Sequence, residues 1–196
     1  MIRRLVMGVA LLAFASTASA QIYTSQAAFE AAMGPGNVAL SYFENFNGVA
    51  NGPAASLNFG PVNGFSYTVF SGPISGLFND SGRISTDNAD DPIRVTFTGA
   101  PVFALGGNFW ATDINFNAIS ANIDILLSNG QSQSYTATGP GNFRGFISPI
   151  PITGFTVTGG LNPNRWPTMD NLRVGVPEPT TMGLLLLGAS ALLRRR

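Results

Sequence analysis

Apolar and polar residues alternate strictly in two stretches of this chain, Phe65-Ser66-Tyr67-Thr68-Val69 and Ile93-Arg94-Val95-Thr96-Phe97-Thr98. Successive side chains of a β-strand point to opposite faces, so each stretch predicts a strand with one buried and one wet face. Half-buried strands of this kind are typical of antiparallel sheets that pack on one side only. The two stretches therefore predict an all-β fold.

Further short strand candidates follow at close intervals, with Gly, Asn and Pro between them. They are 102–109, 123–127, 133–138, 143–148, 155–158 and 171–174. Many short strands separated by turn residues predict an antiparallel β-sandwich. Segments 42–46, 145–148 and 170–172 also resemble elements of a family of exported bacterial β-domains. This resemblance implies a jelly-roll-like sandwich, a shape that lectins and carbohydrate-binding modules share, although fold alone does not give function.

The turns and loops of this sandwich are also readable. Ser128-Asn129-Gly130 predicts a tight hairpin, because Asn-Gly readily supplies a positive φ at both central positions. Segments 47–64, 71–82 and 159–168 are rich in Gly, Asn and Pro, and we expect them to be loops at the ends of the sandwich.

One short helix is expected near the N-terminus. Ser25 is a good N-cap for 26–33, where Phe29 and Met33 share one face, and Gly34-Pro35 should end the helix.

Charge and composition exclude several classes of function. All ten basic residues are arginines, and the chain has no cysteine and no histidine. Five arginines lie near the termini, which leaves five against nine acidic residues in 21–175, a net charge of −4. Without a basic patch, nucleic-acid binding is not expected, and without cysteine, packing alone must hold the fold.

The same absences bear on catalysis. Without His, Cys or Lys there is no Ser-His-Asp triad, cysteine nucleophile, Schiff-base lysine or histidine zinc site. A glycosidase-type carboxylate pair could still come from acids in strand-like surroundings, although nothing in the sequence fixes their separation. These acids are Glu44, Asp113, Asp124 and Asp170. We expect a non-enzymatic protein that needs no cofactor.

Two loop segments are candidate binding sites. Asp87-Asn88-Ala89-Asp90-Asp91 could hold a structural Ca²⁺ through Asp87, Asp90 and Asp91, or could form an ordinary Asx turn before the next strand. Asn164-Arg165-Trp166 could bind a glycan, with the indole stacked on a sugar ring and the polar groups bonded to hydroxyls. Alternatively, Trp166 covers the end of the sandwich.

The N-terminus has the layout of a secretory signal peptide at 1–20. Arg3 and Arg4 precede an apolar stretch at 5–14, and Ala18-Ser19-Ala20 supplies the small residues that cleavage requires. Cleavage after Ala20 by the export machinery would leave Gln21 as the mature terminus, whereas an uncleaved anchor is the alternative. We therefore expect passage through the export translocon.

The C-terminus carries a second signal. Val176-Pro177-Glu178-Pro179-Thr180-Thr181 leads into an apolar stretch at 182–193, and Arg194, Arg195 and Arg196 end the chain. As a hydrophobic helix, twelve residues reach about 18 Å, short of a hydrocarbon core of about 30 Å, which suits a transient anchor. Terminal arginines stay on the cytoplasmic side and orient 21–175 outward.

Residues 176–196 resemble the PEP-CTERM sorting signal of exported bacterial proteins. Val176, Pro177, Glu178 and Pro179, the apolar stretch and the three arginines carry the resemblance, about a tenth of the chain. It implies that an exosortase-type enzyme cuts near the Pro-Glu-Pro element and that the protein passes to the cell surface or exopolysaccharide matrix.

These observations predict a three-part chain: a signal peptide at 1–20, an exported β-sandwich domain at 21–175 and a sorting signal at 176–196. The leading functional prediction is a structural or adhesive component of the matrix that contacts extracellular polysaccharide. The alternative is a carbohydrate-binding, lectin-like module, and a secreted glycoside-processing enzyme is a further one.

Overall fold

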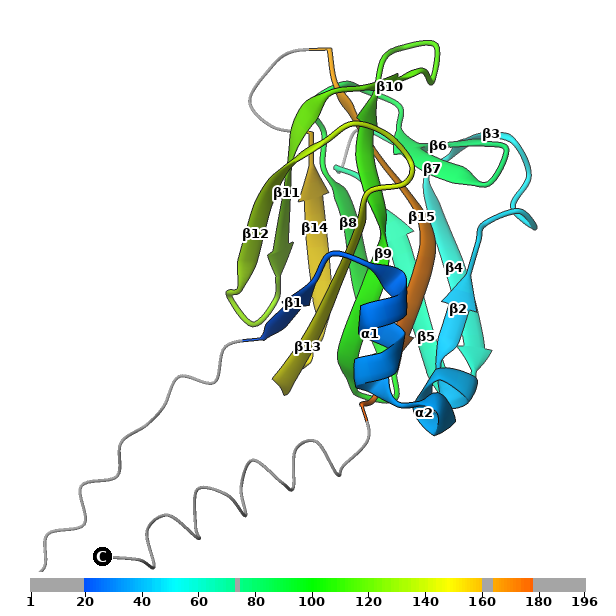
Figure 1. Cartoon of the computed structure of the whole chain (residues 1–196). Helices are drawn as coiled ribbons and strands as arrows, with labels where there is room; N and C mark the ends of the chain where they lie inside the picture. Colours follow the sequence, from blue (N-terminus) through cyan, green and yellow to red (C-terminus); the bar gives the residue numbers. More distant parts are fainter. Residues whose placement is uncertain (1–19, 73–74, 160–163, 178–196) are drawn as a thin grey trace, which may run out of the picture.

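Two antiparallel sheets pack face to face in the computed structural model, which describes residues 20–72, 75–159 and 164–177 (Figure 1). Every strand pair is antiparallel. This arrangement confirms the predicted all-β, jelly-roll-like sandwich.

The first sheet has nine strands. In spatial order seven of them are β1 (Gln21–Tyr23), β13 (Phe143–Ile152), β9 (Val102–Thr112), β15 (Trp166–Gly175), β7 (Arg83–Thr86), β6 (Leu77–Asp80) and β3 (Gly52–Ala54). Two short strands add to it: β10 (Ala118–Ile119) pairs with β9, and β2 (Tyr42–Glu44) pairs with β15.

The second sheet has six strands. Their order is β12 (Ser132–Ala137), β11 (Ala121–Leu127), β14 (Gly154–Thr158), β8 (Ile93–Gly99), β5 (Phe65–Phe70) and β4 (Ser56–Val62). The two alternating stretches that predicted the fold are β5 and β8, and they are neighbours, with Tyr67 opposite Phe97. In β5, Phe65, Tyr67 and Val69 are buried, whereas Ser66 and Thr68 are partly exposed, as the alternation predicts.

The core lies between the sheets. Phe109 of β9 meets Phe155 of β14 edge to face, with ring centroids 5.8 Å apart. Phe109 is fully buried and Phe155 is 3% exposed. Burying one large apolar side chain contributes about 1.5–3 kcal/mol, so contacts of this kind hold the two sheets together without disulfides.

Two helices pack on one face of the nine-stranded sheet, the first over β13 and β9 and the second against β15. The predicted helix is α1 (Gln26–Met33), and the Ser25 hydroxyl accepts a hydrogen bond from the Ala28 amide, which confirms the N-cap. Its Phe29 ring lies on Gly145 of β13, where a β-carbon would come within 2.6 Å of that ring. A glycine is therefore required for the helix to dock.

A second helix, α2 (Pro35–Leu40), was not predicted. The sequence predicts that Gly34-Pro35 ends the first helix, but Pro35 also begins α2. Proline fits the first turn of a helix because an N–H there has no partner within the helix.

The three predicted loops are partly strands. The first contains β3 and β4, the second contains β6, and β15 already begins at Trp166 in the third. Turn residues misled the prediction, because β4 is an edge strand and tolerates Gly60 and Pro61, which would disrupt a central strand.

The predicted hairpin between β11 and β12 is confirmed, but its turn differs. Gly130 has a φ of 86°, whereas Asn129 does not have a positive φ. The Gly130 amide donates to the Leu127 carbonyl at 3.0 Å, so the loop is a three-residue turn closed by glycine.

Both sorting signals lie mostly outside the described residues. This holds for 1–19, which include Ala18, and for 178–196, which include the hydrophobic stretch and Arg194 to Arg196. Within the described part of the chain, no helix has the length and apolar character needed to cross a membrane. The predicted signal peptide and C-terminal hydrophobic helix therefore remain predictions.

Candidate functional site

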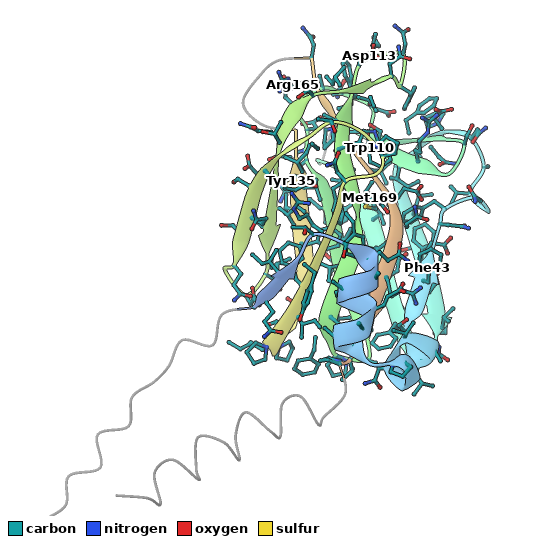
Figure 2. All side chains as sticks on the ribbon, in the orientation of Figure 1. Phe43, Trp110, Asp113, Tyr135, Arg165 and Met169 are labelled. Atoms are coloured by element: carbon teal, nitrogen blue, oxygen red, sulfur yellow. The ribbon has the colours of Figure 1, made fainter. Side chains whose placement is uncertain are left out.

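A pocket of about 180 Å³ lies at one end of the nine-stranded sheet, where β7 and β9 end and β15 begins. Figure 2 shows Asp113, which follows β9, at this end of the molecule. The lining combines three aromatic rings, two carboxylates, an isoleucine and a threonine: Phe78, Phe116, Trp166, Asp87, Asp113, Ile114 and Thr86.

Strand register places part of this lining on the outer face of the sheet. Trp166 lies opposite Thr112, Thr168 lies opposite Ser85, and Ser85 lies opposite Phe78. Paired residues share a face, as do residues two apart on one strand. Trp166 and Phe78 therefore project on the same side, away from the core between the sheets.

Three buried hydroxyl groups connect β9, β15 and β7, the strands next to the pocket. The Thr168 hydroxyl lies 3.2 Å from the Thr112 hydroxyl and 3.2 Å from that of Ser85. Ser85 also donates to the Pro167 carbonyl at 3.1 Å. All three hydroxyl residues are fully buried. Fully satisfied buried networks rigidify a structure, so the strands that carry Trp166 and Phe78 are held in place beside the pocket.

Two hydrogen bonds fix the turn after β7 to the start of β15. The Trp166 Nε1 donates to the Asp87 carbonyl at 3.3 Å, and the Asp90 amide donates to the Arg165 carbonyl at 3.0 Å. The indole is partly buried, and this bond sets the direction in which the ring projects. Trp166 thus lines the pocket with its indole held in a fixed orientation.

The opposite wall is the loop between β9 and β10, which Asp113 organises. One Asp113 oxygen accepts from the Asn115 and Asn117 amides at 2.8 and 2.9 Å, and the other accepts from the Asn117 side chain at 3.1 Å. These bonds close an Asx-type turn around the carboxylate.

Phe116 in this loop has a φ of 60°, a conformation that costs a phenylalanine energy. Its ring packs on Phe78 with centroids 5.1 Å apart. The neighbouring Ile114 is 71% exposed. Strained backbone and exposed apolar surface occur together at binding sites, where the surroundings hold the residue in place.

The pocket is acidic. Hydrogen bonds from the Asn117 side chain and from the Asn115 and Asn117 amides lower the pKa of Asp113 below its ordinary value of 3.8, so this carboxylate is ionised at neutral pH. The Asp87 carboxylate lies against Gly76, where a β-carbon would come within 2.7 Å of it. Among the described residues, the ion pairs join Arg83 to Asp80 and Arg173 to Glu30, so neither pocket carboxylate is paired with an arginine.

A second hollow of about 390 Å³ adjoins the pocket, because Asp87 lines both. Its other lining residues are small: Pro53, Ala54, Ala55, Gly72, Ser75 and Gly76. The two hollows thus lie next to each other, with Asp87 between them.

The structure combines residues from two separate sequence hypotheses. Trp166 from the glycan hypothesis and Asp87 from the calcium hypothesis line one pocket. Asn164 and Arg165 do not line it; Asn164 is exposed and the base of the Arg165 side chain lies beside Gly159.

The predicted calcium cluster is not assembled. Within the described residues, no three acidic side chains come close enough to hold a metal ion, so Asp87, Asp90 and Asp91 do not form one. Instead, the segment forms a turn in which Asp90 has a φ of 69° and the Thr86 hydroxyl donates to the Asn88 carbonyl.

The four acids considered for glycoside cleavage do not meet in this pocket. Only Asp113 lines it; Glu44 lies in β2, Asp124 in β11 of the other sheet and Asp170 in the middle of β15. Burial raises the pKa of Asp170, although the Asn171 amide and Arg83 oppose this. The acid with a raised pKa is thus not the acid in the pocket.

Phe78, Ile114 and Phe116 were missed by sequence reasoning. Asp113-Ile114-Asn115-Phe116-Asn117 held a usable signal, because it alternates large apolar residues with Asp or Asn between two strands. Asp and Asn make turns, so large apolar residues between them indicate a loop that presents apolar surface.

A third hollow, about 350 Å³, lies on the outer face of the six-stranded sheet, across β5, β8, β14 and β11. Phe70, Arg94 and Leu126 are among its lining residues. It contains none of the sequence-predicted site residues.

No protein-family model and no curated protein matches this chain. Among solved structures, the chain is similar to a family 29 carbohydrate-binding module, with a TM-score of 0.39, 9% identity and coverage of 70% of this chain and 90% of the module. A mutant of that family in complex with mannohexaose has a TM-score of 0.41 at 9% identity, covering 70% and 93% of the two chains. Another, in complex with cellulohexaose, has a TM-score of 0.39 at 9% identity, covering 70% and 92%. Likeness at this level concerns the sandwich fold and carries no argument about the ligand.

Proposed function

We propose that this protein is an exported carbohydrate-binding module whose binding site is the pocket between Trp166 and the 113–117 loop. The observation that carries the proposal is the convergence of three aromatic rings and two carboxylates on a preformed, rigidly supported recess. Concave sites with apolar walls and a few fixed polar groups are the usual form of small-ligand sites.

The chemistry of the lining suits a sugar. A pyranose has an apolar face of C–H groups, which stacks on an aromatic ring, and an edge of hydroxyls, which donate to carboxylates. Trp166, Phe78 and Phe116 supply the rings, and Asp87 and Asp113 supply the acceptors. Because the Asp113 carboxylate already accepts three hydrogen bonds within its loop, the Asp87 carboxylate can accept more hydrogen bonds from a ligand.

The size of the recess favours a chain over a single sugar. Pockets for drug-sized ligands measure about 300–1,000 Å³, so about 180 Å³ accommodates one ring. The adjoining hollow of about 390 Å³, which shares Asp87, provides room for the next ring of an oligosaccharide.

Binding is better supported than hydrolysis. A glycosidase needs one carboxyl group with a raised pKa to protonate the leaving oxygen. Asp113 has a lowered pKa, which suits a hydrogen-bond acceptor and not a proton donor.

The sorting signals give the setting of this module. Cleavage after Ala20 would leave Gln21, the first residue of β1, so processing there would keep the described domain whole. Exosortase cleavage near Pro177-Glu178-Pro179 would follow directly after β15, which ends at Gly175. The module would then act at the cell surface or in the exopolysaccharide matrix, where binding polysaccharide is itself an adhesive role. Carbohydrate binding, the alternative prediction from the sequence, thus becomes the main proposal, and the structural or adhesive role follows from it.

A polysaccharide pull-down and a glycan array with the full chain test the proposal. We expect Trp166→Ala to weaken binding about tenfold, since an aromatic contact contributes about 0.5–1.5 kcal/mol and 1.4 kcal/mol is a factor of ten. Leu126→Ala is the matched control, because Leu126 is 52% exposed on the other sheet. Binding that Leu126→Ala removes and Trp166→Ala leaves intact would move the site to the six-stranded sheet; no binding to any glycan would refute the function.

A further inference from the structure

We infer that the pocket selects a positively charged sugar, an oligosaccharide of amino sugars whose amines are free and protonated. This inference rests on the proposed sugar-binding function and specifies its ligand class. Within the described lining, two carboxylates without an ion-pair partner lie beside aromatic faces.

The carboxylates come first. Asp87 and Asp113 both line the pocket, and no arginine is among the described residues of its lining. Among the described residues, neither carboxylate takes part in an ion pair. Hydroxyl-bearing neutral ligands leave this charge uncompensated, whereas a protonated amine forms charge-assisted hydrogen bonds, which are roughly twice as strong as neutral ones.

The aromatic rings act in the same direction. Phe78 and Phe116 lie 5.1 Å apart with an angle of 36° between their planes, and Trp166 lines the same pocket. A cation within about 6 Å of a ring centroid is attracted to the negative face of the ring, most strongly for tryptophan. Rings combined with carboxylates therefore favour an ammonium group over an uncharged one.

The charges around the pocket extend this preference. Asp90 and Asp91 follow Asp87 in the same turn, and Asp90 is exposed. Arg165 directly precedes Trp166, but the base of its side chain lies beside Gly159 and it is not among the lining residues of the pocket. The net charge of −4 over 21–175 would also draw cationic ligands toward the domain and repel anionic ones.

The same features disfavour acidic sugars. The carboxylate of a uronic acid would approach Asp87 and Asp113 without a counter-charge, and like charges at close range cost energy. A module that binds polysaccharide through this pocket would therefore discriminate between a deacetylated amino-sugar polymer and a uronate polymer.

Titration calorimetry with three oligosaccharides of equal length tests the inference. Oligomers of glucosamine and of N-acetylglucosamine share the sugar ring but differ in charge, and oligogalacturonate carries the opposite charge. The full chain is titrated in a non-glycosidic detergent at about pH 6, where an amine of ordinary pKa is protonated. We expect glucosamine oligomers to bind about tenfold more tightly than the N-acetylated ones, about 1.4 kcal/mol, and the uronate to bind least.

Two variants separate a local effect from a general one. Asp87→Asn keeps the side-chain shape and should abolish the preference for the free amine. Asp124→Asn removes the same charge from β11 of the other sheet and should leave the preference unchanged.

The outcomes are distinct. Equal or tighter binding of the N-acetylated oligomer, with loss in Trp166→Ala, would overturn the charge inference and leave sugar binding intact. Equal loss in both aspartate variants would also overturn it, since the preference would then reflect net charge alone. Absence of binding to all three oligomers would overturn the charge inference, whereas absence of binding to every glycan of the array would overturn both proposals.

Discussion

The Trp166 Nε1 donates a hydrogen bond to the backbone carbonyl of Asp87, 79 residues earlier in the chain, at 3.3 Å. This bond joins the start of β15 to the turn after β7 and places an indole beside a carboxylate. Both residues line the candidate pocket, so the contact that positions the tryptophan also helps to form the site. The Trp166 indole therefore lines the site in an orientation that the backbone carbonyl of Asp87 sets.

Phe116 allows the ring and the backbone to be tested separately. Asparagine adopts a positive φ more readily than phenylalanine, so Phe116→Asn should preserve the loop while it removes the ring that packs on Phe78. We expect a melting temperature close to that of the wild type and a loss of glycan affinity. Differential scanning calorimetry and the glycan pull-down provide the two readings. A large fall in melting temperature would mean that the ring is needed for folding.

Asp113 should give the loop a defined acid sensitivity. Its folded-state pKa is lowered, so its contribution to stability is present above its ordinary value of 3.8 and is lost as pH falls from 3.8 through the folded-state pKa. Melting curves of the wild type and Asp113→Asn across this range should therefore converge as pH falls. A constant difference between the two proteins at every pH would contradict the prediction.

The sandwich itself was readable from the sequence because its central strands alternate regularly. β5 and β8 each have a buried apolar face, and 26–33 has a good N-cap, so local pattern and tertiary structure agree. The edge strands β3 and β4 were missed because edge strands tolerate the Gly, Pro and Asn that otherwise indicate loops, and β6, which lies next to β3, was missed with them.

The site was only half readable for a different reason. Trp166 and the Asp87 cluster stood out by residue type, yet nothing local indicated that they meet. Their proximity depends on β15 pairing between β9 and β7, a long-range choice of partners. Phe78 became part of the site only through its register with Ser85, which no local pattern fixes.

Arg173 of β15 should stabilise the packing of the two helices on the nine-stranded sheet. It lies 3.2 Å from the Glu30 carboxylate of α1, donates to the Ser41 hydroxyl at 2.7 Å and lies over the Phe43 ring at 4.7 Å. Hydrogen bonds to charged groups contribute about 1.5–3 kcal/mol, so Arg173→Ala should reduce the free energy of unfolding by about 2–3 kcal/mol.

Urea denaturation measures this change, and Glu30→Gln serves as its control. Glutamine keeps an acceptor oxygen but removes the charge, so it should cost less than Arg173→Ala. A null effect of Arg173→Ala on the denaturation midpoint would show that packing of Phe29 and Met33 alone docks the helices.

Processing at both ends is open to direct measurement. We expect the mature protein to begin at Gln21 and to lack Arg194, Arg195 and Arg196, since the sorting proposal requires cleavage near Pro177-Glu178-Pro179. Intact-mass and terminal-peptide mass spectrometry of protein isolated from the native cell surface can read both ends. A surface protein that still ends in Arg196 would contradict the sorting proposal.

The central claim is that a sugar occupies the pocket beside Trp166, and the chain contains an internal control for it. Only two tryptophans are present, and Trp110 is 1% exposed. In a nitrogen-15-labelled sample of the full chain, titration with glucosamine oligomers should shift the indole N–H resonance of Trp166 and leave that of Trp110 in place. An unchanged Trp166 resonance at a concentration where calorimetry shows the oligomer bound would contradict the account.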